Sequence, residues 1–296
     1  MLFFLLLSWV GQAFASDEKL QAMSEILAAS KPSDWRTVSP ENTLYMDLDR
    51  GRVVIELAPD FAPKHVENVK ALARDRYWDG LAIIRTQDNY VVQWADPNSD
   101  NPEKKRPLKN GKATLAAEFD RKLDAKVPFN RLNEPDVYAR EVGFSSGFPV
   151  ARDAAENKMW MLHCYGAVGA GRDVSPDSGG GTELYAVIGH APRHLDRNVT
   201  LVGRVIDGME YLSASKRGPV PMGFYTNPVD RVSIKAFRLA TDVPEKERTN
   251  FEVLRTDTPL FAKLVKSRKF RPEAWFFHHP QHIEVCNVPI PARIKH

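Results

Sequence analysis

Residues 43–57 read TLYMDLDRGRVVIEL, in which apolar and polar side chains alternate on both sides of the turn Asp49-Arg50-Gly51. Successive side chains of a β-strand point to opposite faces, so this alternation gives each stretch one apolar face. Two such stretches joined by a tight turn are typical of an antiparallel hairpin. The sequence therefore predicts two paired strands that share a buried face.

Six further strand-like stretches follow the hairpin. They lie at residues 81–85, 90–95, 159–163, 184–188, 201–205 and 232–237. Two core helices interrupt them, and one begins at Ala62-Pro63, because proline suits the first position of a helix. Short, evenly spaced strands favour closure, which leaves no strand edge exposed. We therefore expect a mainly β fold, a closed antiparallel eight-stranded barrel capped by two helices, with an insertion and a carboxyl-terminal extension.

The composition of the chain limits the classes of protein to consider. Its 296 residues are 43% hydrophobic and 27% charged, which excludes a disordered chain. The formal charge of +3, from 41 basic and 38 acidic residues, is too balanced for a nucleic-acid-binding surface. Partners must therefore be inferred from individual sites, and no nucleic acid is expected among them.

The amino terminus has the features of a secretion signal. An apolar run, Met1–Val10, precedes Ala13-Phe14-Ala15, which has the small-x-small pattern that signal peptidase accepts. The run is shorter than the roughly 20 residues that span a bilayer, so no stable membrane insertion is expected after cleavage. We predict a signal peptide at residues 1–15 and a periplasmic or secreted protein. The alternative is a buried amino-terminal helix.

Changes in composition divide the rest of the chain into three parts. Residues 16–41 are interpreted as an amino-terminal helix and a linker that contains two prolines. The barrel domain covers residues 42–240, with an irregular insertion at about 97–157 where Pro, Gly and Ser break any long period. Residues 241–296 form an extension with a charged connector, a short helix around 260–265, and an aromatic and proline-rich tail.

Several groups of residues in the barrel domain form a distinctive pattern when taken together, because of their order and spacing along the chain. In chain order they are Ala62-Pro63, Asn68, Tyr77-Trp78-Asp79-Gly80, Ile84-Arg85, Tyr90-Val91, Gln93, Gly181–Tyr185, His194-Leu195-Asp196 and Val202–Met209. On these residues the chain resembles the cyclophilin family of peptidyl-prolyl cis-trans isomerases over about residues 43–240. The resemblance implies a cyclophilin-like domain that acts on proline-containing polypeptides without a cofactor or a metal.

The resemblance also implies a set of site residues. Arg85 and Gln93 are the expected catalytic residues. Substrate-binding roles are implied for Tyr90, Val91, Glu183, Tyr185, His194, Leu195 and Val199. Rotation about a peptide bond crosses a barrier of about 18–20 kcal/mol, and the guanidinium of Arg85 can donate a hydrogen bond to the twisted proline nitrogen. Gln93 is expected on the same strand face as Arg85, because their spacing is even.

Some positions depart from the family pattern. Ile84 stands where His is common, Trp94-Ala95 replaces Gly-Gly, Glu183 replaces Gln, and Val199 replaces His or Tyr. These changes spare the two catalytic residues but alter the pocket wall. Two functions therefore remain open. One is an isomerase for X-Pro bonds in exported proteins, and the other is a catalytically weak cyclophilin-like binding or chaperone module for proline-containing segments.

The cysteines and a carboxyl-terminal group of histidines are further candidates for chemistry. Cys164 and Cys286 either form a disulfide that ties the tail to the core or remain two buried thiols. Three histidines at residues 278–282 and Cys286 have metal-ligating side chains, but Pro280 breaks any helix that would align the histidines. We expect no metal at this cluster.

Overall fold

The hairpin at residues 43–57 forms as predicted. The computed structural model describes residues 20–295. Within it, β2 (Thr43–Leu48) and β3 (Gly51–Leu57) pair antiparallel, with Leu44 opposite Ile55. Both of these side chains lie in the main hydrophobic core. The alternation in the sequence thus indicates which face of the hairpin points into the barrel core, whereas Tyr45 and Val54 on the other face are buried in a separate cluster.

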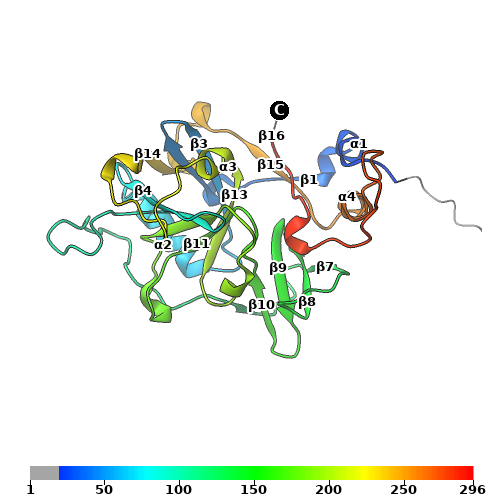
Figure 1. The fold of residues 1–296 in the computed structure, drawn as a ribbon, viewed down its shortest axis with the longest axis horizontal. Coiled ribbons are helices and arrows are strands. Elements are labelled where there is room, and N and C mark those ends of the chain that lie inside the picture. The colour runs from blue at the N-terminus through cyan, green and yellow to red at the C-terminus, as the bar shows by residue number, and fades with distance from the viewer. Residues whose placement is uncertain (1–19, 296) are drawn as a thin grey trace, which may run out of the picture.

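Eight antiparallel strands close into a barrel in the order β11-β12-β5-β4-β14-β2-β3-β13, with β13 paired to β11 (Figure 1). The strands outside the hairpin are β4 (Ala82–Thr86), β5 (Val91–Ala95), β11 (Ala167–Ala170), β12 (Leu184–Val187), β13 (Leu201–Asp207) and β14 (Val232–Leu239). Two helices, α2 (Pro63–Arg74) and α3 (Met209–Ser213), contribute buried side chains to the barrel core. The predicted mainly β fold is confirmed.

The prediction for one of the eight barrel strands is wrong. The stretch at 159–163 forms β10 (Lys158–Met161), which belongs to a separate sheet, and β11 takes its place in the barrel. The sequence of β11 is Ala-Val-Gly-Ala, which lacks the alternation that marks a strand. Its position depends on its neighbours, because Gly169 pairs with Tyr185 of β12 and with Leu201 of β13.

The insertion is more regular than its sequence indicates. It forms most of a five-stranded sheet in the order β6-β10-β9-β8-β7. Its strands besides β10 are β6 (Arg121–Lys122), β7 (Asn130–Leu132), β8 (Glu141–Ser145) and β9 (Phe148–Asp153). Ser146 and Gly147, which interrupt the pattern in the sequence, form the β8–β9 turn with φ of +48° and +86°. Positive φ at both positions suits a tight hairpin, so these residues join two strands rather than end regular structure.

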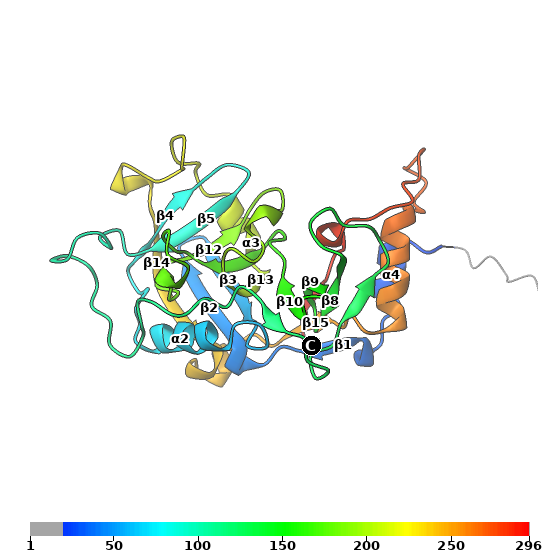
Figure 2. The same cartoon turned by 90° about the horizontal axis from the view of Figure 1, so that it is seen from below.

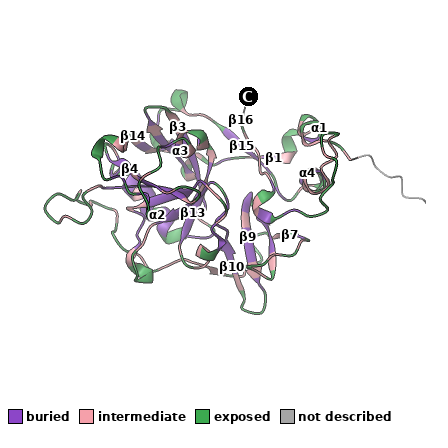
Figure 3. Cartoon of the chain, viewed as in Figure 1, coloured by how far each residue is buried: buried purple, intermediate pink, exposed green. Residues whose placement is uncertain are grey.

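The described segments before and after the barrel pack with the insertion around a second core. β1 (Trp35–Thr37), β15 (Phe251–Leu254) and β16 (Ala292–Ile294) form a three-stranded sheet, so the segment interpreted as a linker contains a strand. Two helices, α1 (Met23–Ala28) and α4 (Pro259–Phe270), pack against each other. Buried side chains of this core include Ile26, Trp35, Phe144, Trp160, Leu254, Phe261 and Val285. Figures 2 and 3 show this second lobe beside the barrel, with exposed loops around both.

Short 3₁₀ turns complete the described chain. They are η1 (Pro32–Asp34), η2 (Pro40–Asn42), η3 (Pro176–Ser178), η4 (Arg193–Leu195), η5 (Pro228–Asp230), η6 (Ala240–Asp242), η7 (Glu245–Glu247) and η8 (Val285–Asn287). Within residues 20–295, no helix has the length and apolar character needed to cross a membrane. The predicted signal peptide, residues 1–15, lies outside the described residues.

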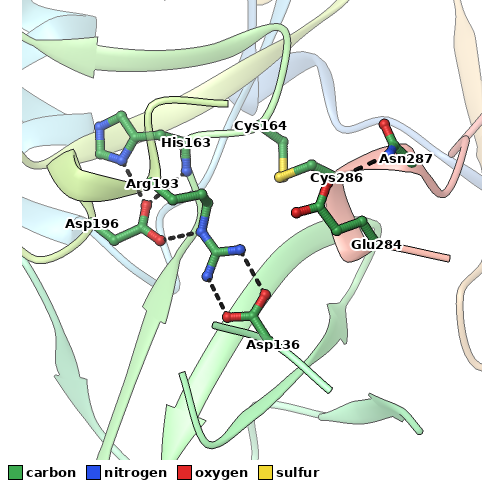
Figure 4. Close-up of a disulfide and its surroundings, with 8 residues drawn as sticks. All are labelled: Asp136, His163, Cys164, Arg193, Asp196, Glu284, Cys286 and Asn287. Atoms are coloured by element: carbon green, nitrogen blue, oxygen red, sulfur yellow. Dashed lines mark hydrogen bonds and ion pairs between the residues drawn. A yellow bond between two sulfur atoms is a disulfide. The ribbon is translucent and has the colours of Figure 1, made fainter. Parts of the chain in front are cut away.

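A disulfide connects the extension to the segment that enters the barrel. Cys164, in the turn between β10 and β11, is bonded to Cys286 in η8, and their Cα atoms are 5.0 Å apart (Figure 4). Both residues belong to the second core or pack against it. Of the two alternatives that the sequence left open, the structure therefore has the bridge.

Candidate active site

An open cavity of about 520 Å³ lies beside strands β4, β5 and β12. Eight of the nine predicted site residues line it, namely Arg85, Tyr90, Val91, Gln93, Glu183, Tyr185, Leu195 and Val199. The ninth, His194, does not line this cavity. It is exposed, and its ring stacks parallel to that of Tyr90 with centroids 6.2 Å apart. The volume is in the range of cavities that bury a small ligand or a few residues of a peptide.

Arg85 and Gln93 reach the cavity from neighbouring strands. The expectation that they lie on one strand is wrong, because Arg85 lies on β4 and Gln93 on β5, but the two residues pair directly across the sheet and so share one of its faces. The register of this pair shifts between Ile83 and Arg85. Ile83 is fully buried in the barrel core, and strict alternation would turn Arg85 inward as well. The irregularity at Ile84 instead directs Arg85 to the cavity on the outer side of the barrel.

Hydrogen bonds hold the guanidinium of Arg85 in one orientation. Its Nη1 donates to Gln93 Oε1 at 3.0 Å, and Gln93 Nε2 donates to Glu183 Oε2 at 2.7 Å. Arg85 Nε donates to the carbonyl oxygen of Met222 at 2.6 Å, and its Nη2 donates to Gln87 Oε1. A guanidinium has five N–H groups, so these three bonds leave two of them for a ligand.

Burial shifts the pKa values of the ionisable groups around the cavity. It lowers the pKa of Arg85, against the opposing effects of Tyr90 and Glu183, but an arginine remains protonated at any physiological pH. Burial raises the pKa of the Glu183 carboxyl group, and the hydrogen bond from Gln93 only partly opposes this effect. Burial likewise raises the pKa of the Tyr90 hydroxyl group, which stays neutral. Arg85 therefore supplies a permanent positive charge, whereas Glu183 binds a proton more readily than an exposed glutamate does.

The side chain of Tyr185 is anchored behind the cavity. Its hydroxyl group is hydrogen-bonded to Nε2 of His163 at 2.9 Å, and Nδ1 of His163 is 2.9 Å from Oδ1 of Asp196. Asp196 in turn accepts a hydrogen bond from Arg193 Nε at 2.5 Å (Figure 4). A Cβ atom at Gly169 would lie 2.4 Å from Cζ of Tyr185, so the ring depends on a glycine at this position of β11. Tyr185 is thus fixed both by its hydroxyl group and by the space that Gly169 leaves.

Residues outside the predicted set complete the wall of the cavity. Met222 and Phe224, in the loop 218–224 between α3 and β14, line the cavity and are 49% and 42% exposed. The Phe224 ring lies 5.1 Å from the guanidinium carbon of Arg85. Residues 171–173 also line the cavity. In the sequence, this loop could have been noticed as part of a site because two large apolar residues stand in a Gly- and Pro-rich stretch, where polar residues are usual.

The carboxyl-terminal histidines and Cys286 make other contacts. His279 Nδ1 is 2.9 Å from the carbonyl oxygen of Arg271, His282 Nδ1 is 2.7 Å from Glu134 Oε2, and Cys286 is in the disulfide. In the described part of the chain, no group of three or more His, Cys, Asp or Glu side chains is placed to hold a metal ion.

The closed barrel and the arginine–glutamine pair on its outer side place the chain in the class of cyclophilin-like proteins. The family model for cyclophilin type peptidyl-prolyl cis-trans isomerase/CLD matches residues 43–239, which is more than half of the chain. The chain therefore belongs to the cyclophilin-type peptidyl-prolyl cis-trans isomerase family. The activity of this family is the cis-trans isomerisation of peptide bonds that precede proline.

Individual relatives agree with this membership. A probable peptidyl-prolyl cis-trans isomerase of Brucella suis biovar 1 (strain 1330) is 30% identical over 179 residues, which cover 60% of this chain and 74% of the relative. The peptidyl-prolyl cis-trans isomerase-like 3 of Mus musculus is 25% identical over 193 residues, or 65% of this chain and 91% of the mouse protein. The crystal structure of cyclophilin AquaCyp293 from Hirschia baltica has the same fold, with a TM-score of 0.71 and 24% identity. The match covers 92% of this chain and 96% of the Hirschia baltica chain, so the likeness in fold extends beyond the barrel.

Proposed function

We propose that the protein isomerises X-Pro bonds in exported polypeptides, and that Arg85 stabilises the twisted bond. The observation that carries this proposal is the guanidinium of Arg85, which is fixed by three hydrogen bonds at the wall of the cavity and keeps two N–H groups free. Its positive charge is permanent and needs no activation.

The chemistry follows from the loss of amide resonance during rotation. In the planar amide the proline nitrogen shares its electron pair with the carbonyl group and is a poor acceptor. As the bond twists, the nitrogen regains this lone pair and accepts a hydrogen bond. A donor at that position therefore stabilises the transition state more than the ground state, which is the requirement for a faster reaction.

The other site residues would hold the substrate against Arg85. Tyr90, Val91, Tyr185 and Leu195 supply the apolar part of the cavity wall, which suits the pyrrolidine ring of proline. When the pyrrolidine ring excludes water from the cavity, the hydrogen bond from the guanidinium becomes stronger. Gln93 uses one N–H of its amide group for Glu183, so the second N–H can bind a carbonyl group of the substrate backbone.

The decisive test is Arg85→Ala in a protease-coupled isomerase assay on a proline tetrapeptide. We expect kcat/KM to fall by about 10²–10³, as for removal of one donor that acts in a transition state, while the thermal unfolding curve stays close to that of the wild type. The control is Arg255→Ala, which removes an exposed arginine paired with Asp257 on the second lobe and should leave the rate unchanged. Full activity of Arg85→Ala would show that Arg85 does not have this role.

The same assay separates the two functions that the sequence left open. Wild-type protein that accelerates exchange supports the isomerase. If the wild-type protein binds a proline peptide without accelerating its exchange, the alternative is favoured, namely a cyclophilin-like binding or chaperone module. Magnetisation-exchange NMR on the same peptide measures binding and exchange in one sample.

A periplasmic or secreted location is part of the proposal. It is supported by the signal-like sequence at residues 1–15 and by the Cys164–Cys286 bridge, because disulfides persist mainly in oxidising compartments. The test is expression of the full chain in a Gram-negative host, followed by amino-terminal sequencing of the protein from the periplasmic fraction. A chain that begins at Ser16 is expected. Full-length protein that remains in the cytoplasm would overturn this part of the proposal.

A further inference from the structure

We propose that a groove beside the proline cavity is an accessory subsite, which binds an apolar side chain of the same polypeptide substrate. This inference rests on the proposed function. The groove has a volume of about 660 Å³ and lies between the β7–β8 loop of the insertion (residues 133–140) and the segment 193–197. None of the roles assigned above to Arg85 and its neighbours uses it.

One short segment of the chain separates the groove from the proline cavity. Leu195 lines the cavity, while His194 and Arg197 line the groove. The His194 ring stacks on Tyr90, which is itself a cavity residue. A polypeptide that leaves the cavity across His194 therefore passes a residue that also lines the groove.

A buried ion pair fixes the insertion loop next to this segment. Arg193 donates through Nη1 and Nη2 to the two carboxylate oxygens of Asp136 at 2.9 and 3.1 Å, and both side chains are 3% exposed. Asp136 Oδ1 also accepts hydrogen bonds from the backbone N–H groups of Tyr138 and Ala139. Figure 4 shows Asp136 and Asp196 on either side of Arg193. The groove is therefore formed before a ligand arrives, which lowers the entropic cost of binding.

Two of the exposed side chains on this loop, Val137 and Tyr138, are apolar or aromatic, next to the exposed Arg140. Val137 is 90% exposed and Tyr138 is 55% exposed, and both line the groove. The Tyr138 ring lies 5.2 Å from the guanidinium carbon of Arg193, which holds one face of the ring in place. Apolar surface that is held rigidly in water gains free energy when a ligand covers it.

The charges of the groove are already paired within the protein. Arg197 contacts Asp120 and Glu156, and Arg140 contacts Asp153. Each arginine that lines the groove has a carboxylate partner, which weakens its attraction for an anion. Its chemistry therefore favours an uncharged apolar or aromatic side chain on an extended backbone.

The experiment compares short and long substrates. A proline tetrapeptide is extended by four residues that include Leu or Phe, on its amino side in one peptide and on its carboxyl side in another. Magnetisation-exchange NMR gives kcat/KM for the protein from residue 16 to 296, which contains every residue of the described fold. We expect one of the two extensions to raise kcat/KM by about tenfold over the tetrapeptide, which corresponds to burial of one apolar side chain.

Two variants locate this gain in the groove. Tyr138→Ser and Val137→Ser should each remove most of the gain and leave the rate on the tetrapeptide unchanged. Val137 is almost fully exposed, so its replacement does not threaten the fold. The matched control is Tyr165→Ser, which removes a tyrosine of similar exposure, 52%, that lines neither cavity.

The outcomes separate this inference from the proposed function. A wild-type protein that does not accelerate exchange of the tetrapeptide refutes the isomerase, and calorimetric affinities of the same peptides then test the groove alone. Equal kcat/KM or equal affinity for all three peptides overturns the subsite. A gain that persists in both Tyr138→Ser and Val137→Ser overturns it as well.

Discussion

Opening the Cys164–Cys286 disulfide is predicted to remove a large part of the stability of the protein. The bridge closes a loop with a sequence separation of 122 residues, which contains four of the eight barrel strands. The chain-entropy relation for a loop of this length gives about 16 cal/mol/K, or about 5 kcal/mol at 25 °C. This value is an upper figure, because measured bridges often contribute less. Domains are typically stable by only about 5–15 kcal/mol, so the expected change is large.

Equilibrium urea unfolding, followed by tryptophan fluorescence and by circular dichroism, measures this contribution. Reduced wild-type protein and the Cys164→Ala/Cys286→Ala variant should both lose about 3–5 kcal/mol relative to the oxidised protein. Addition of reductant should not affect the variant, which controls for effects of the reductant itself. Isomerase activity in native buffer should change little, because neither cysteine lines the cavity. A loss below about 1 kcal/mol would refute the entropic reasoning.

Two further substitutions test the electrostatics and the support of the cavity. Burial raises the pKa of Glu183 in the folded state above its value in the unfolded state, so the folded protein binds the proton more tightly. The contribution of Glu183 to stability therefore falls as the pH rises from the unfolded-state pKa to the folded-state pKa. Glu183→Gln should therefore gain stability relative to the wild type as the pH rises above the unfolded-state pKa of glutamate, which urea titrations at a series of pH values measure. A difference that does not change with pH contradicts this prediction. Tyr185→Phe leaves Nε2 of the buried His163 without a partner and should cost about 1–3 kcal/mol of unfolding free energy, so an unchanged urea midpoint would show that the hydroxyl group does not support the fold.

The barrel could be predicted from the sequence wherever a strand has an alternating apolar face. β2 and β3 have such a face, and their hairpin forms as expected. β11 does not, because the Tyr185 ring lies across Gly169 and leaves no room for a side chain there. The packing that fixes this tyrosine at the cavity therefore also removes the pattern by which β11 could be recognised. The stretch at 159–163 has the stronger pattern and therefore predicts a barrel strand where the structure has β10 of the separate sheet.

The candidate site could be predicted only in part. The spacing of Arg85, Tyr90 and Gln93 along the chain brings these residues to one cavity, although Arg85 and Gln93 meet by pairing of two strands and not along a single strand. Met222 and Phe224 could not be predicted, because they are far from Arg85 in the sequence. Pairing of β14 with β4 in the closed barrel brings the loop before β14 to this arginine. Such a contact depends on closure of the barrel, and the two large apolar residues in this Gly- and Pro-rich stretch do not indicate which residue they contact.

The insertion takes part in the construction of the cavity. A buried path runs from the insertion to the cavity through Asp136, Arg193, Asp196, His163 and Tyr185. Removal of one partner from a buried ion pair typically costs about 3–5 kcal/mol, because the other charge is left without compensation. Deletion of the β7–β8 loop would remove Asp136 and leave Arg193 with Asp196, the carboxylate that also contacts His163. Arg193 would keep part of its compensation, so the expected cost lies below this range. We expect the deletion to disturb the contact between His163 and Tyr185, and urea unfolding of the deletion variant measures the resulting loss of stability.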